Sequence, residues 1–349
     1  MTVRYFATIA LAMSVPLAGQ WLKYPTPGIP RTADGKPNLT APTPKLSDGK
    51  PDLSGVWQID GLGFAFNITG NQKTDNMLPS AQALYKQRSE TYSQGDPNAN
   101  CLPAGPRTGL FSQELLKIIH TPPLAAILYE EGPHRQIFID GRPLPKDPNP
   151  AWMGYSIGRW EGDTLVIDSA GFNDRTWLDI AGHPHSEALH VTERFTRKDF
   201  GHMQLDMTFD DPKTYLKPWT ITMGVNFIPD TDLLEYVCNE NEKDRPHMIG
   251  KQQDEREKEV KVAREILSKY VGSYRAGPVG ILRISLDGDQ LAVELPGGGG
   301  KLPVFAQSET EFFLPTLGSG VEFVKDSKGA VTRLMLRTVE GNNEAVRVP

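Results

Sequence analysis

The sequence predicts an all-β protein of two antiparallel β-barrels or sandwiches that are joined by a helix. Apolar runs of strand length recur between turn residues in residues 101–250 and again in residues 270–349, without helical stretches between the runs. Glycine (33 residues) and proline (29 residues) are abundant, which favours many turns over long helices. A charged, helix-favouring stretch at residues 251–269 separates the two strand-rich regions.

The N-terminal fifty residues have no strand pattern. Residues 1–18 predict a secretory signal peptide, because Arg4 precedes an apolar run of about signal-peptide length. This run is too short to span a membrane as a helix, and the alternative is a buried N-terminal helix. Residues 19–50 are rich in Pro, Thr and Gly, have no periodicity, and therefore predict an extended linker.

The remaining chain divides into two predicted domains. Residues 51–250 predict the first β-barrel domain, which also holds a helix over residues 79–94. Its clearest hairpin is GYSIGRWEGDTLVIDSAGF, in which the tight turn at residues 161–163 separates two strand-like runs. Residues 251–269 predict the linker helix, and the alternative is a solvated surface helix. Residues 270–349 hold about eight short strands, which is the size of a small closed barrel.

Cys101 and Cys238 predict one disulfide, because an exported chain with an even number of cysteines usually pairs them. Such a bridge would close a loop of well over a hundred residues and would stabilise the fold by roughly 4–5 kcal/mol in the chain-entropy treatment. The alternative is two buried free thiols. With the signal peptide, the disulfide predicts a periplasmic or secreted protein.

The composition restricts the partners. The 349 residues are 38% hydrophobic and 23% charged, so either domain can bury a core of its own. The net charge of −6 and the absence of a Lys/Arg-rich run argue against a nucleic-acid partner. We expect a small-molecule ligand or substrate and no membrane span, and the sequence does not indicate the oligomeric state.

Several motifs resemble known families. SGVWQ (Ser54–Gln58) and GSYRAG (Gly272–Gly277) resemble the Gly-x-aromatic strand of lipocalin-like (calycin) barrels. Residues 270–349 also resemble the small barrel appended to many secreted β-lactamase-like hydrolases. The first domain also resembles an uncharacterised family of exported bacterial proteins. The motifs that carry this resemblance are CLPAGPR, IDGRPLP, GRWEGDTLVIDSAGFNDRTWLD, GHPHSEALHVTERF and LLEYVCNENEKDRPH. These resemblances imply two lipocalin-like barrels and no particular activity.

Three of the seven histidines lie in one stretch, TWLDIAGHPHSEALHVTERF (residues 176–195), together with several carboxylates. Histidine titrates near neutral pH, and a neighbouring carboxylate can orient its ring, so the stretch predicts a general acid–base site. We expect Asp179 and His185 to form the central pair, with Glu187 and His190 as further catalytic residues.

The same stretch allows a metal as an alternative. No cofactor is expected, but a bound divalent metal would take its ligands from His183, His185, His190 and Glu193. The spacing differs from the His-Glu-x-x-His motif of zincins, in which two histidines four residues apart share a helix face. The pattern therefore does not identify a metal site.

Aromatic and cationic residues of the first domain are candidates for substrate binding. Ligand sites are mostly apolar and carry a few fixed polar groups. We expect that role for Trp177, Arg194, Tyr129, Arg142 and Tyr155. If residues 189–195 form a strand, His190 and Arg194 lie on one face and Glu193 on the other, and the alternative is that the first face is simply solvated.

These observations favour an exported enzyme that performs general acid–base chemistry on a small molecule, as a hydrolase, lyase or isomerase. The alternative is a lipocalin-like binding protein that holds a small apolar or aromatic ligand without breaking a bond. A third reading is an interaction scaffold. The group of histidines favours the enzyme, because buried titratable groups cost free energy unless they are satisfied.

Overall fold

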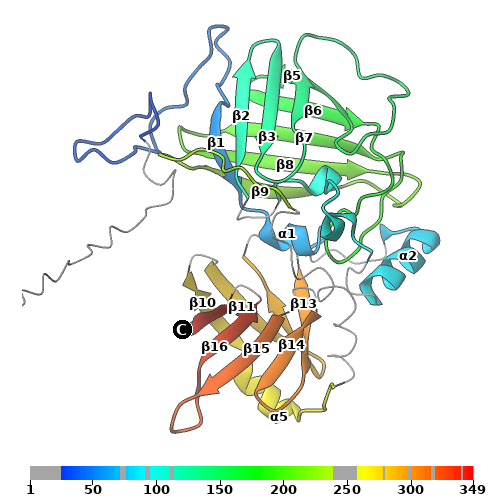
Figure 1. The fold of residues 1–349 in the computed structure, drawn as a ribbon, viewed down its shortest axis with the longest axis vertical. Coiled ribbons are helices and arrows are strands. Elements are labelled where there is room, and N and C mark those ends of the chain that lie inside the picture. The colour runs from blue at the N-terminus through cyan, green and yellow to red at the C-terminus, as the bar shows by residue number, and fades with distance from the viewer. Residues whose placement is uncertain are drawn as a thin grey trace, which may run out of the picture.

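The computed structural model describes residues 25–70, 76–90, 95–110, 114–238, 258–277, 280–296, 300–315, 319–338 and 341–348. Two closed β-barrels hold most of the regular structure (Figure 1), which confirms the all-β prediction. The predicted signal peptide lies outside the described residues. Among the described helices, none is both long and apolar enough to cross a membrane.

The first barrel is closed by a pairing between its first and last strands. Neighbouring strands are antiparallel except β4 and β5, which are parallel and are linked by residues 139–154. The predicted hairpin is confirmed, because β5 and β6 pair across the turn at Gly162, whose φ is +63°. The nine strands are β1 (Gly55–Ile59), β2 (Leu116–Thr121), β3 (Leu124–Tyr129), β4 (Arg135–Phe138), β5 (Tyr155–Glu161), β6 (Thr164–Ala170), β7 (His190–Arg197), β8 (His202–Asp210) and β9 (Trp219–Phe227).

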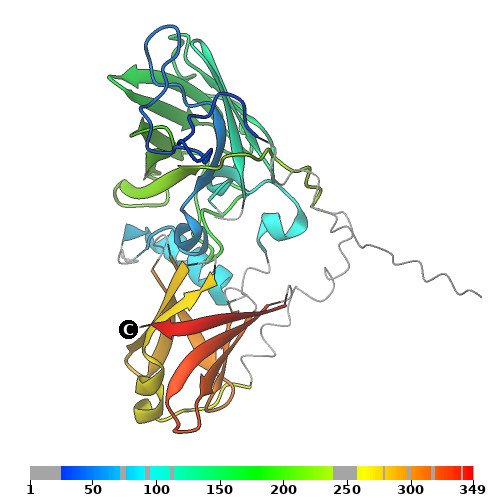
Figure 2. The same ribbon diagram turned by 90° about the vertical axis from the view of Figure 1, so that its left-hand side faces the viewer.

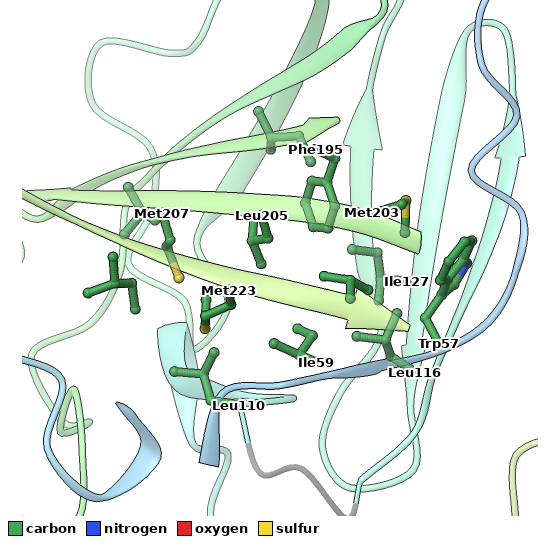
Figure 3. Packing of buried hydrophobic residues seen from close by; sticks show 14 of the residues in the cluster. Trp57, Ile59, Leu110, Leu116, Ile127, Phe195, Met203, Leu205, Met207 and Met223 are labelled. Carbon is green, nitrogen blue, oxygen red and sulfur yellow. The ribbon is translucent and has the colours of Figure 1, made fainter. Parts of the chain in front are cut away.

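Side chains fill the interior of this barrel. Burial alternates residue by residue along β8 and β9, as expected when one face of a strand points inward. Met203, Leu205 and Met207 of β8 and Met223 of β9 meet Ile59 and Leu116 inside the barrel (Figure 3). The barrel is therefore a packed core and not an open channel.

The second barrel is antiparallel throughout, and β10 pairs with β17 to close it. Tyr270, which precedes the first strand, stacks on Phe323 with the ring centroids 4.2 Å apart and fills the interior. The eight strands are β10 (Gly272–Ala276), β11 (Gly280–Asp287), β12 (Gln290–Glu294), β13 (Lys301–Ala306), β14 (Glu311–Leu314), β15 (Ser319–Lys325), β16 (Val331–Thr338) and β17 (Gly341–Val348).

The predicted linkers both lie against a barrel. Residues 25–50 are fixed to the first barrel, where Phe200 N–H donates to Ala41 O and Arg31 pairs with Asp230. Within the predicted linker helix, residues 251–257 lie outside the described part and residues 258–263 are not helical. Val260 N–H there donates to Ala306 O, so the segment follows the second barrel, and the helix α5 covers only Arg264–Leu267.

Within the described residues, two α-helices belong to the first domain. The helix α2 (Pro79–Glu90) begins where predicted and buries only Ala81, and the predicted residues 91–94 lie outside the described part. The short helix α1 (Leu62–Phe66) lies between the two barrels in both views (Figures 1 and 2). Its Phe66 is buried in the hydrophobic core of the second barrel, whereas Phe64 packs against the core of the first. This helix therefore joins the two cores.

We predict that Phe66→Ala lowers the free energy of unfolding of the second barrel by about 3–4 kcal/mol, because it removes a buried ring from that core. Urea unfolding followed by tryptophan and tyrosine fluorescence measures this change. Phe64→Ala on the same helix is the matched control and should affect mainly the first barrel. Equal destabilisation of the same transition by both variants would contradict the assignment.

Candidate functional site

The histidine-rich connection between β6 and β7 is organised by one buried carboxylate. Asp179 accepts four hydrogen bonds, from the backbone N–H groups of Ile68 (2.6 Å), Gly182 (2.9 Å) and His183 (3.0 Å) and from His183 Nδ1 (2.5 Å). The expected partner was His185. Gly182 has a φ of +101° and turns the chain back, so the ring four residues after Asp179 reaches it instead.

The paired ring of His183 is completely buried. Tyr85 of α2 stacks on it with the ring centroids 4.2 Å apart, and its Nε2 has no hydrogen-bond partner among the described residues. The backbone at residues 180 and 181 also donates to Ala65 O and Phe66 O of α1. The pair of Asp179 and His183 thus holds the connection, α1 and α2 together and is covered from solvent.

His185 occupies a separate buried place. Its Nδ1 lies 3.2 Å from the Ser186 carbonyl and therefore carries the proton, so Nε2 accepts from Thr176 Oγ1 at 2.6 Å. Burial lowers the pKa of His185 and keeps the ring neutral. Both ring nitrogens are thus used within the protein, which leaves no free nitrogen for a substrate.

The two other predicted catalytic residues lie on the outside. Glu187 is exposed. The predicted division of β7 into two faces is correct, and the face with His190 and Arg194 is the outer one. His190 Nε2 is 3.8 Å from Asp168 Oδ1, and Arg194 Nη1 is 2.8 Å from Glu161 Oε2. Surface ion pairs of this kind contribute little stability.

The metal candidates are not brought together. His183 and His185 have the partners given above, His190 faces outward, and Glu193 points into the barrel. Nowhere in the described residues do three or more His, Cys, Asp or Glu side chains form a group that could hold a metal ion.

Three predicted substrate-binding residues also have other neighbours. Trp177 is buried, and the Arg88 guanidinium lies 4.7 Å from its ring centroid. Arg142 and Tyr155 form an exposed cluster, in which Arg142 Nη1 donates to the Tyr155 hydroxyl at 3.1 Å. The same guanidinium is paired with Asp140. These side chains are engaged in contacts within the protein.

The interior of the first barrel contains a satisfied ion pair. Arg135 makes a two-pronged contact with Glu193, with N–O distances of 3.0 and 2.5 Å, and also donates to Ser156 and Ser169. Tyr129, the remaining predicted binding residue, lies beside Arg135. The adjoining cavity measures only about 20 Å³, which holds roughly one water molecule. The interior is therefore too full for an organic ligand.

A larger cavity lies beside the disulfide. The predicted bridge between Cys101 and Cys238 is confirmed, with a Cα–Cα distance of 5.6 Å. Both cysteines line a cavity of about 230 Å³, and two carboxyl groups, Glu114 and Glu131, face it. The other lining residues are Asn98, Leu102, Pro103, Ala104, Thr108, Gly132, Pro133 and Tyr236.

The hairpin of β2 and β3 brings the two carboxyl groups together. Leu116 pairs with Tyr129 at the end of the hairpin, and continuing this register by two residues places Glu114 opposite Glu131. Neither glutamate is among the site residues predicted from the sequence. The signal was present in ELLKIIHTPPLAAILYEE, in which the two glutamates lie at equal distances from the Pro-Pro turn.

The electrostatics of this cavity are unusual. Burial first, and then the negative charge and hydrogen bond of Glu131, raise the pKa of Glu114 from an ordinary value of 4.5 to about 8. The Gly109 backbone and the buried Arg107 oppose this rise, but Arg107 is already paired with Asp96 at 2.6 Å. Glu114 therefore stays protonated at neutral pH and donates a hydrogen bond to Glu131.

Neighbouring groups hold the cavity in place. Asn98 Nδ2 donates to Glu131 Oε1 at 3.3 Å. Glu130 accepts from the backbone N–H groups of Leu115 and Leu234, both at 3.0 Å, and so fixes the segment before Cys238 to the hairpin. Glu114 can therefore accept or donate one proton near neutral pH, at a cavity whose lining is held by these contacts.

We predict that Asp179→Asn lowers the free energy of unfolding by about 3–5 kcal/mol, because an amide nitrogen replaces one acceptor oxygen at a fully buried site. Chemical denaturation at pH 7 measures the loss. The control is Asp199→Asn, which alters the half-exposed pair of Asp199 and His202. A control that is as destabilised as Asp179→Asn would contradict this role.

A second prediction concerns pH. The folded state holds the Glu114 proton more tightly than the unfolded state, so stability falls as pH rises from about 4.5 to about 8. Glu114→Gln should remove this fall and raise the free energy of unfolding at pH 8 by roughly 1–3 kcal/mol. Urea unfolding between pH 5 and 9 measures both effects. The exposed Glu187→Gln is the control, and parallel pH profiles for all three proteins would refute the assignment.

Comparison with known proteins identifies one region of the chain. Residues 256–347 match a family described as a domain of unknown function, DUF3471. The match covers the second barrel and the end of the segment before it, about a quarter of the chain, and does not include the cavity. No curated protein matches the chain.

Proposed function

We propose that the first barrel domain is an acid–base enzyme for small organic molecules, and that Glu114 is its proton-transfer group. One arrangement supports the proposal: Glu114 and Glu131 together line a cavity of about 230 Å³, where burial and the neighbouring carboxyl group raise the pKa of Glu114 to about 8. Carboxyl groups with a pKa shifted this far cluster at functional sites. The reaction classes that use such a group include those of hydrolases, lyases and isomerases.

In this proposal the two carboxyl groups have different tasks. Glu114 donates its proton when it is neutral and accepts one when it is ionised, and a pKa near the working pH makes both steps accessible. Glu131 takes the hydrogen bond of the neutral Glu114 and is itself oriented by Asn98. Glu114 is thus the catalytic residue and Glu131 the positioning residue.

The competing function is a lipocalin-like binding protein. Such a carrier would hold its ligand inside the first barrel, where the cavity of about 20 Å³ and the ion pair of Arg135 and Glu193 leave no room. Typical ligand pockets measure about 300–1,000 Å³. The cavity beside the disulfide is the better place for a ligand, and its titratable pair favours catalysis over simple binding.

We further propose that the chain is exported and acts in the periplasm or outside the cell. The disulfide fits an oxidising compartment. The signal-like N-terminal residues support the same location. Fractionation of cells that produce the full chain, with N-terminal sequencing of the product, tests this proposal.

The catalytic proposal is tested with 5-nitrobenzisoxazole, a probe that requires only a positioned base. The carboxylate takes the proton from C3, the N–O bond breaks, and a coloured nitrile-bearing phenolate forms. We expect catalysis that rises with pH to a plateau above about 8, and a loss of at least about tenfold in Glu114→Gln.

The exposed Glu187→Gln is the matched control and should keep the full rate. A Glu114→Gln protein with the rate of the wild type would contradict the assignment of the base. A wild-type protein no faster than free acetate at the same carboxylate concentration would contradict the acid–base function itself.

A further inference from the structure

The lining of the cavity beside the disulfide carries charge of one sign only. Among the described residues that line it, Glu114 and Glu131 are acidic and none is basic. Among the described residues, the cation that acts on Glu114 is Arg107, which is about 1% exposed and is paired with Asp96. An anionic ligand would therefore meet a negative group without compensation, whereas a cationic ligand would meet a favourable one.

The rim of the same cavity is apolar and exposed. Leu102 and Tyr236 line the cavity and are 45% and 53% exposed, and Leu234 and Val237 in the segment before Cys238 are 54% and 51% exposed. Large apolar side chains grouped at the edge of a cavity mark a binding site more often than isolated ones do. The segment is held by Glu130, so the rim has a fixed position.

We propose that this cavity binds a small organic ammonium ion, whose nitrogen lies between Glu114 and Glu131 and whose apolar substituent contacts the rim. The inference rests on the proposed function, because it names the substrate class of the same site. The ammonium group supplies a positive charge and N–H donors, and so replaces the proton that Glu114 holds. Tyr236 adds an aromatic ring, and the face of such a ring attracts cations.

The size of the cavity and the number of its oxygen donors favour a small organic ammonium ion over a larger molecule or a metal ion. The volume of about 230 Å³ lies below the range of about 300–1,000 Å³ that is typical of larger ligands, which suits a single ring or a short alkyl chain. A divalent metal would require further oxygen ligands. The described residues around the two glutamates provide no third carboxylate, histidine or thiolate for it.

The inference is tested by isothermal titration of the full chain with benzylamine. Benzyl alcohol and benzoate serve as the neutral and anionic probes of nearly the same shape. We expect benzylamine to bind at least about tenfold more tightly than either. At pH 7 the binding should release a proton, which is measured from the dependence of the heat on the ionisation enthalpy of the buffer.

Two variants make the test specific. Glu114→Gln and Glu131→Gln should each weaken benzylamine binding about tenfold or more, and Glu114→Gln should also abolish the proton release, while Glu187→Gln should bind like the wild type. Circular dichroism and urea unfolding confirm that each variant is folded. Equal affinity for benzyl alcohol, or benzylamine binding that survives both substitutions, would overturn the inference.

The outcome is distinguishable from failure of the proposed function. Catalysis of the benzisoxazole reaction without benzylamine binding would contradict the ammonium ligand and support Glu114 as the base. Benzylamine binding without that reaction would support the ammonium ligand and contradict Glu114 as the base. If both hold, benzylamine should inhibit the reaction competitively, because both molecules require the same carboxyl pair.

Discussion

The arrangement of the molecule depends on the buried carboxylate of Asp179. Its four acceptor contacts fix the connection between β6 and β7 and the chain just after α1. A buried charge is tolerated only when donors surround it, so these contacts must form together. Because α1 carries Phe66 into the core of the second barrel, the same carboxylate helps to set how the two barrels join. The ring of His183 therefore contributes to this junction.

The buried and half-buried acids differ in how their charge is compensated. Asp96 faces Arg107, Glu193 faces Arg135, and Asp179 is surrounded by N–H groups. Each of these negative charges is compensated. Glu114 differs, because its closest charged neighbour is another carboxylate and its proton is retained to a pKa of about 8. The pairing of Glu114 with Glu131 therefore opposes folding, whereas the other three acids are compensated. Unfavourable local arrangements of this kind are expected at functional sites.

The sequence predicted the fold better than the site, for a physical reason. Strand alternation, turns and the disulfide are local or pairwise patterns, and the hairpin around Gly162 and the bridge of Cys101 and Cys238 followed from them. The partner of Asp179 depended instead on the left-handed turn at Gly182, which selected His183 over His185. Predicting that Glu114 lies beside Glu131 required the register of the β2–β3 hairpin. The group of histidines in residues 176–195 instead favoured a site in that stretch.

The position of the cavity follows from the filling of the first barrel. Side chains and the pair of Arg135 and Glu193 occupy the interior, and the cavity beside the disulfide lies at the end of the β2–β3 hairpin. Connecting segments are normally mobile, and a binding site needs fixed groups. The disulfide, which joins residues 137 positions apart, together with Glu130 holds the segment before Cys238 over the end of the β2–β3 hairpin. The covalent bridge thus gives a surface site the rigidity that the barrel core supplies elsewhere.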